Sequence, residues 1–192
     1  HAGNTNITTG HLSNIKGEIS AKRDMVLKTD SVDNQAGTIF AENTLSVAVK
    51  NALSNTQAAH LAAKEAVDIQ AGSIDNSGGN LYSVNNALKV RSSGAINNTD
   101  GYVAAAKDLQ LSASSLNNQR IDAAKKQAIV TGDNVTLDIT GLLQNSGDVY
   151  AKGKAQVDAD SLNNDKGNLS AEKTLNLAVT TDVSNQEGRI TA

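Results

Sequence analysis

Apolar and polar residues alternate in short stretches along the whole chain. Ile39 and Ala41, for example, lie two positions apart, and Leu45 and Val47 resume the same spacing after a short polar interruption. A period of two places alternate side chains on opposite faces of an extended chain, so it is typical of a half-buried β-strand. The pattern predicts two well-formed strands and a shorter third segment in each stretch.

These stretches belong to one repeating unit, as LSNIKGEISA at residues 12–21 and LNNDKGNLSA at 162–171 show. The units start at the apolar residues Leu12, Val32, Leu53, Ile74, Ile96, Leu116, Leu142, Leu162 and Val183. Successive starts are 20–22 residues apart, except for a spacing of 26 after Leu116. A chain that returns to the same place at this period pairs the strands of neighbouring units in parallel. The sequence therefore predicts an all-β parallel β-helix of about nine coils, with ~20–21 residues and ~4.8 Å of rise per coil.

A polar position recurs two residues after the start of the unit. It is occupied by Asn14, Asn34, Asn55, Asn76, Asn98, Asn118, Asn164 and Asn185. Side-chain amides stacked at the coil spacing can hydrogen-bond to one another, so these residues predict a structural Asn ladder. The glycines that follow are Gly17, Gly37, Gly79, Gly101, Gly147, Gly167 and Gly188. We expect each of them to supply a turn conformation that a Cβ would oppose.

The long sixth unit indicates an insertion. Matching Ile129 to Ile19 and Val135 to Met25 restores the later strands and leaves six extra residues before Ile129. We therefore expect residues 119–128 to form a corner insertion loop. Its basic residues are Arg120, Lys125 and Lys126. Such a loop is either a tolerated surface insertion or a binding loop.

The amino-acid composition limits which side chains can fill the core and which classes of partner the chain can have. Three Tyr, one Phe and no Trp are too few large side chains to fill the centre of an ordinary globular core. We therefore expect a thin interior of Leu, Val, Ile and Ala. The chain has no Pro and no Cys, so nothing interrupts backbone pairing and no disulfide or thiolate metal site forms. A formal net charge of −3 with scattered Lys and Arg argues against a nucleic-acid partner. No apolar run reaches the ~18 residues of a membrane span.

The repeated phrase, in the forms VDNQAGTIFAENTLSV and LNNDKGNLSAEKTLNL, resembles the haemagglutinin repeats of the filamentous haemagglutinin family. The likeness runs from Ile7 to Ala192. Members of that family are large exoproteins of Gram-negative bacteria, exported by two-partner secretion, and include contact-dependent growth inhibition effectors. The resemblance implies a right-handed parallel β-helix on the bacterial surface, and passage through an outer-membrane transporter during secretion.

Motifs of catalysis and metal binding are missing from the sequence. The histidines His1, His11 and His60 lack the spacing of a zinc site, and the chain has no GxSxG, P-loop or GxGxxG motif. Some right-handed β-helices are polysaccharide lyases or hydrolases that use clustered acidic residues. We expect Asp68, Asp138 and Asp158 to come from separate, nonadjacent coils. No catalytic residue, metal site or cofactor is therefore expected, and the chain is interpreted as a non-enzyme.

One outward row of the predicted rod carries no charge. Between the inward Ile and Ala of the first strand, the outward position is occupied by Ser20, Phe40, Ala62, Tyr82, Ala104, Val130, Tyr150 and Ser170. Tyr102 lies two residues earlier on the same side, so the candidate contact face is Phe40, Tyr82, Tyr102 and Tyr150. Its rings could stack on sugars or pack against another rod, or could simply suit strands. The second strand instead carries mostly Lys, Arg and Asp outward.

Two functions are consistent with these features. The first is a structural and adhesive stalk segment of a secreted exoprotein, either an adhesin or a toxin carrier, which holds a binding tip or toxin away from the cell. The alternative is a receptor- or carbohydrate-binding module that uses the aromatic face. The chain begins within a unit and Ala192 corresponds to Ala21, so we expect residues 1–192 to be one β-helix segment with neighbouring coils of the same exoprotein at both ends.

Overall fold

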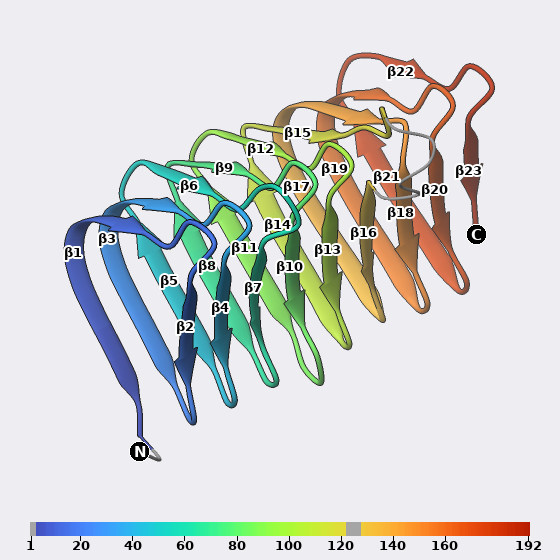
Figure 1. The fold of residues 1–192 in the computed structure, drawn as a ribbon. Helices are drawn as coiled ribbons and strands as arrows, with labels where there is room; N and C mark the ends of the chain where they lie inside the picture. The colour runs from blue at the N-terminus through green and yellow to red at the C-terminus, as the bar shows by residue number, and fades with distance from the viewer. Residues whose placement is uncertain (1–2, 122–127) are drawn as a thin grey trace.

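The computed structural model describes residues 3–121 and 128–192, and these form a parallel β-solenoid (Figure 1). All pairings between the strands are parallel, and each strand pairs with its counterparts in the preceding and following coils. The coils lie side by side along the rod, with the N-terminus at one end and the C-terminus at the other. The all-β parallel solenoid expected from the repeat is therefore confirmed.

One side of the rod is a nine-stranded sheet, to which each coil contributes one strand. We call it sheet B. Its strands are β2 (Glu18–Ala21), β4 (Thr38–Ala41), β7 (His60–Ala63), β10 (Asn80–Ser83), β13 (Tyr102–Ala105), β16 (Ile129–Gly132), β18 (Asp148–Ala151), β20 (Asn168–Ala171) and β23 (Arg189–Thr191). These are the first strands of the repeating unit.

The other strands form a 14-stranded sheet, sheet A, which bends to make a long and a short face. The long face contains β5 (Leu45–Val49), β8 (Val67–Ala71), β11 (Leu88–Ser92), β14 (Asp108–Ala113) and β21 (Thr174–Val179). The short face contains β6 (Ala52–Ser54), β9 (Ser73–Asp75), β12 (Ala95–Asn97), β15 (Ser115–Asn118) and β22 (Val183–Ser184). Four longer strands run through both faces, namely β1 (Thr5–Ser13), β3 (Met25–Asp33), β17 (Asn134–Asn145) and β19 (Lys154–Asn163).

The three faces enclose a thin aliphatic core. In one coil, Ile39 of sheet B, Leu45 of the long face and Leu53 of the short face are each at most 1% exposed. Their counterparts in the other coils are also mostly Leu, Ile, Val and Ala. One coil cannot cover its own inward side chains, so the stacking of coils provides the burial. In agreement, the inward Leu12 and Leu175 of the terminal coils are only partly buried.

The asparagines form a continuous ladder at the corner between the short face and sheet B. Each side-chain Nδ2 donates to Oδ1 of the next Asn towards the C-terminus at 2.6–2.8 Å. Each Nδ2 also donates to a backbone carbonyl of the next sheet B strand, as Asn34 does to His60 O at 3.0 Å. The amides therefore satisfy one another inside the rod. The ladder has a further member, Asn145, which is 1% exposed.

The glycines of this corner have a different role from the one expected. The left-handed backbone conformation falls on the residue before six of the seven, for example Ala36 at φ 52°, and Gly147 is the exception. Gly78 is the only glycine with positive φ in the described residues. The repeated glycine is required by space, because a Cβ added at Gly79 would lie 1.8 Å from the carbonyl oxygen of Asn55. The close approach of the Asn ladder, not the turn conformation, excludes a side chain there.

The sixth unit has a different register from the one expected. Leu143, not Leu142, pairs with Leu116 and Leu162, which brings Asn145 into the ladder. The pairing of β17 with β19 shifts by one residue between Ile139 and Leu142, which absorbs the difference.

Sheet B is also displaced by one residue at this coil. Val130, not Ile129, is the buried inward residue, and Ile129 pairs with Tyr102. Thr131 therefore takes the outward place expected for Val130. The extra residues lie between Asn118 and Val130, an interval of 12 positions where Asn98 and Val103 are 5 apart.

Candidate interaction surface

The outer side of sheet B, called here the aromatic face, carries all four aromatic residues of the chain. Phe40, Tyr82 and Tyr150 occupy one row, separated by small residues in the intervening coils. Tyr102 belongs to the neighbouring row, where it pairs with Asn80 and Ile129. The candidate contact residues are thus on one side of the rod. Phe40, Tyr82 and Tyr150 each stand between small neighbours, and no ring is stacked directly on another ring within its row.

The spacing of the rings produces a shallow hollow on the aromatic face. A groove of about 420 Å³ lies between Tyr82 and Tyr102, and Ala104 forms part of its floor. Thr131 and Asn80 add polar groups to its lining, and none of the described residues that line it is charged. Ala62, in the same row as the rings, is fully buried although it points outward. The groove is therefore an apolar slot with a few neutral hydrogen-bonding groups.

His60 and Tyr82 shape one end of this groove. Their rings meet edge to face, with centroids 6.0 Å apart and planes at 86°. His60 Nδ1 is buried and has no hydrogen-bond partner in the described structure. Burial, helped by nearby Tyr102, raises the pKa of the Tyr82 hydroxyl above its ordinary value. Tyr82 therefore stays protonated and can donate a hydrogen bond throughout the neutral range.

Tyr150 is in a different situation from the other tyrosines. Its hydroxyl donates a short hydrogen bond to the carboxylate of Glu172 in the next coil. That hydrogen bond, followed by burial, raises the pKa of the Tyr150 hydroxyl. The ring is consequently held towards its own neighbouring coil, so Tyr82 and Tyr102 are the aromatic residues that line an open space.

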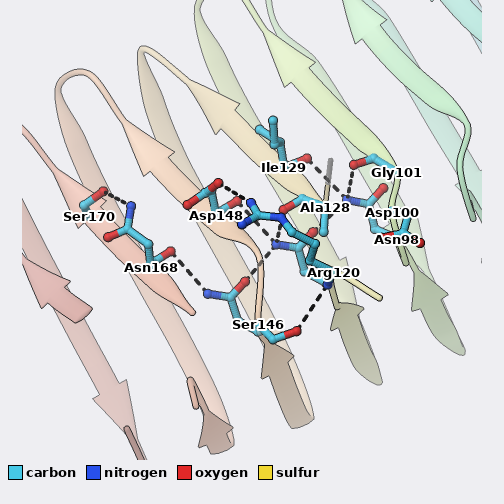
Figure 2. Close-up of polar contacts among 12 residues, drawn as sticks. Asn98, Asp100, Gly101, Arg120, Ala128, Ile129, Ser146, Asp148, Asn168 and Ser170 are labelled. Carbon is cyan, nitrogen blue, oxygen red and sulfur yellow. Dashed lines mark hydrogen bonds and ion pairs between the residues drawn. The ribbon is translucent and has the colours of Figure 1, made fainter. Parts of the chain in front are cut away.

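The described ends of the insertion are fixed to neighbouring coils (Figure 2). Arg120 pairs with Asp148 at 2.6 Å, and its backbone N–H donates to Ser146 Oγ at 3.2 Å. The backbone N–H of Ile121 donates to Asp100 at 2.9 Å. Arg120 therefore belongs to an ion pair at the rod surface. Lys125 and Lys126, the other basic residues expected in the loop, lie outside the described residues.

The outer side of the long face is charged. Asp138 and Asp158 are direct partners in register there, with Asp160 two residues further along β19. Sequence reasoning assigned Asp138 and Asp158 to nonadjacent coils, and the register of β17 and β19 corrects this. Nevertheless, the described residues contain no group of three or more His, Cys, Asp or Glu arranged to hold a metal ion.

A second polar row stands beside the ladder and was missed from the sequence. It consists of the residue before each ladder Asn. Asp75 and Asn97, for example, accept the backbone N–H two residues on, at 3.0 and 3.2 Å. Such Asx turns stabilise the corner from outside. The doublets Asp75-Asn76 and Asn97-Asn98 are the sequence signal that could have revealed it.

The comparisons with known proteins identify the repeat. The haemagglutinin repeat model matches residues 1–48, 31–100, 84–147 and 130–192, which together span the chain. The chain belongs to the filamentous haemagglutinin family. No curated protein and no solved structure matches it.

Haemagglutinin repeats are the repeats of adhesin-like exoproteins exported by two-partner secretion, which are secreted or exposed at the surface. The repeat is a structural and adhesive unit. Among the described residues, no helix is long and apolar enough to cross a membrane.

Proposed function

We propose that the chain is a stiff spacer within a large exoprotein, which holds a binding tip or a toxin domain away from the cell that produces it. The main observation in support of this proposal is the Asn ladder, whose hydrogen bonds run from coil to coil through the whole stack. Together with the parallel backbone bonds of three faces, it joins each coil to the next at many points. Bending the rod would stretch many of these bonds at once.

Removal of one complete coil tests the spacer. Deleting residues 53–73 joins equivalent positions of adjacent units and retains all four aromatic residues. The shortened chain should stay folded, lose about 4.8 Å of length by small-angle scattering, and leave the adhesion or toxin delivery of its exoprotein in place. Deleting residues 53–63, half a coil, is the control and should unfold the chain because it destroys the register. Loss of adhesion with a folded one-coil deletion would contradict a spacer.

The second candidate function is binding of a receptor or a neutral glycan by the aromatic face. The observation that favours it is the uncharged groove between Tyr82 and Tyr102, since sugar rings stack on aromatic side chains and their hydroxyls need polar partners. Changing Phe40, Tyr82 and Tyr150 together to Ser should then abolish binding to cells or arrayed glycans while the far-ultraviolet circular dichroism is unchanged. Equal binding by the wild-type and the folded triple variant would eliminate this role.

A further inference from the structure

The charges on the outer side of the long face are divided along the rod. We number the coils by their strands on this face, β1, β3, β5, β8, β11, β14, β17, β19 and β21, and include the first residue after the face. Coils two to five carry Lys28, Lys50, Lys89 and Arg91, with Asp30 and Asp68. Coils six to nine carry Asp138, Asp158 and Asp160, with Asp108 and Lys154 at the starts of their strands β14 and β19, so this half is acidic overall. We call this surface the charged face.

The acidic half is not neutralised by the described part of the chain. Asp138 and Asp158 are opposite one another in register, an arrangement that is unfavourable for like charges. Asp158 accepts a hydrogen bond from Gln156 at 2.8 Å. None of the carboxylates of Asp138, Asp158 and Asp160 is in an ion pair with a described residue. Together with Asp160 they line a hollow of about 350 Å³.

The basic half has a matching hollow of about 630 Å³, whose charged lining residues are Lys28, Lys50, Arg91 and Asp30. Arg91 pairs with Asp68 at 2.6 Å. Neither lysine is in an ion pair with a described residue. One face of the rod thus presents a hollow of net positive charge and a negative hollow, centred about five coils or ~24 Å apart along the axis.

We propose that the charged face pairs with the same face of a second copy of this chain, with the two rods antiparallel. Two flat faces can meet through a two-fold axis that lies between them, either along the rod or across it. An axis along the rod places each coil opposite itself, so that basic meets basic. An axis across the rod reverses the second copy and places each basic half on an acidic half, which satisfies both patches in one closed dimer.

The strand register indicates which residues meet. With the axis between coils five and six, coil three faces coil eight and each lengthwise row faces itself. Lys50 and Asp160 both follow the last inward residue of the long face, so they come opposite one another twice in the dimer. Next to the axis, Lys89 and Arg91 of coil five face the uncharged Gln110 and Ser112 of coil six in the other copy, so no direct like-charge pair forms between these rows. About eight overlapping coils with strands of five residues bury roughly 1,300 Å² in total, within the range of stable interfaces.

A charge-exchange series on the 192-residue chain tests this pairing by analytical ultracentrifugation. The wild-type should form dimers that weaken as salt is raised. Lys50→Glu and Asp160→Lys should each weaken the dimer by at least about tenfold, because each places two like pairs in the interface. Both the double variant, with the two charges exchanged, and an equimolar mixture of the single variants should recover the dimer, since every contact is then again between opposite charges.

The controls are Lys152→Glu and Asp133→Lys, which reverse exposed charges on the turns between sheet B and the long face and should not alter dimerisation. A monomer at all concentrations, or a dimer that is indifferent to the charge series, would overturn the proposal. So would growth into longer oligomers that respond to the series, because it would indicate parallel, staggered rods. Circular dichroism of every variant separates loss of pairing from loss of folding.

Discussion

The ladder corner and the aromatic face belong to the same coils but tolerate change very differently. At the corner, Asn76 is fully buried, bonded on both sides and pressed against a glycine. On the aromatic face the equivalent position changes from Phe40 to Ala62 to Tyr82 in successive coils. The inward contacts of the repeat hold the fold, whereas its outward positions are free to vary. Function is therefore to be sought on the outer faces.

The largest expected effect is at the corner glycine. Gly79→Ala places a Cβ 1.8 Å from a backbone oxygen of the preceding coil, so the chain must separate there. We expect a loss of about 3 kcal/mol or more in the free energy of unfolding, measured by denaturant titration. Gly78→Ala is the matched control, because Gly78 has positive φ and open space around it. It should cost only about 1–2 kcal/mol.

The ladder amide comes next. Asn76→Leu leaves one N–H of the Asn55 amide without its acceptor and the Asn98 side-chain oxygen without its ladder donor inside the rod, at a cost of roughly 1–3 kcal/mol. Asn43→Leu, at an exposed turn where Asn43 bonds to Asp24, should cost less. The midpoints of thermal unfolding compare the two. Equal midpoints would show that the ladder does not stabilise the corner more than a turn residue does.

A single change on the aromatic face should matter less. Phe40→Ser removes a ring that points outward and is half-buried, with an expected cost below about 1 kcal/mol. Its neighbour Ile39 is fully buried, so Ile39→Ser is the comparison for an inward position. It should lower the free energy of unfolding several times more than Phe40→Ser does. Chemical denaturation of both variants measures the difference between outward and inward positions. Similar losses would mean that the aromatic face is part of the folding core.

The smallest effect has the opposite sign. Ala36 has φ 52°, a left-handed conformation that a Cβ opposes, so Ala36→Gly should stabilise the chain by up to about 1 kcal/mol. Ala48→Gly, in the extended strand β5, should instead destabilise it by about 0.5–1 kcal/mol because glycine gains freedom in the unfolded chain. Differential scanning calorimetry would detect the two opposite shifts. If both variants shifted the unfolding temperature in the same direction, backbone strain at Ala36 would not be the cause of the effect.

The sequence predicted most of the ladder and the placement of the aromatic residues, because both follow from a period that repeats in nearly every unit. It failed where two neighbouring apolar residues could each point inward. Leu142 and Leu143, or Ile129 and Val130, fit the alternating pattern equally well. A slip of one residue turns every following side chain to the other face. The pairing of Asp138 with Asp158 had a different cause, because the two residues are one period of 20 apart and precede the shift, so the expectation of nonadjacent coils was wrong within the predicted register itself.

The sequence by itself determined that the chain is a parallel β-solenoid with an aliphatic interior, since its strand-like alternation returns at a fixed period. Only the tertiary structure decided which leucine of the sixth unit is buried, why a corner such as that of Gly79 requires a glycine, and how charge is distributed along the charged face. These features arise between coils. The hydrogen bonds, close contacts and charges that decide them join residues about twenty positions apart, whose exact alignment is fixed only when the coils stack.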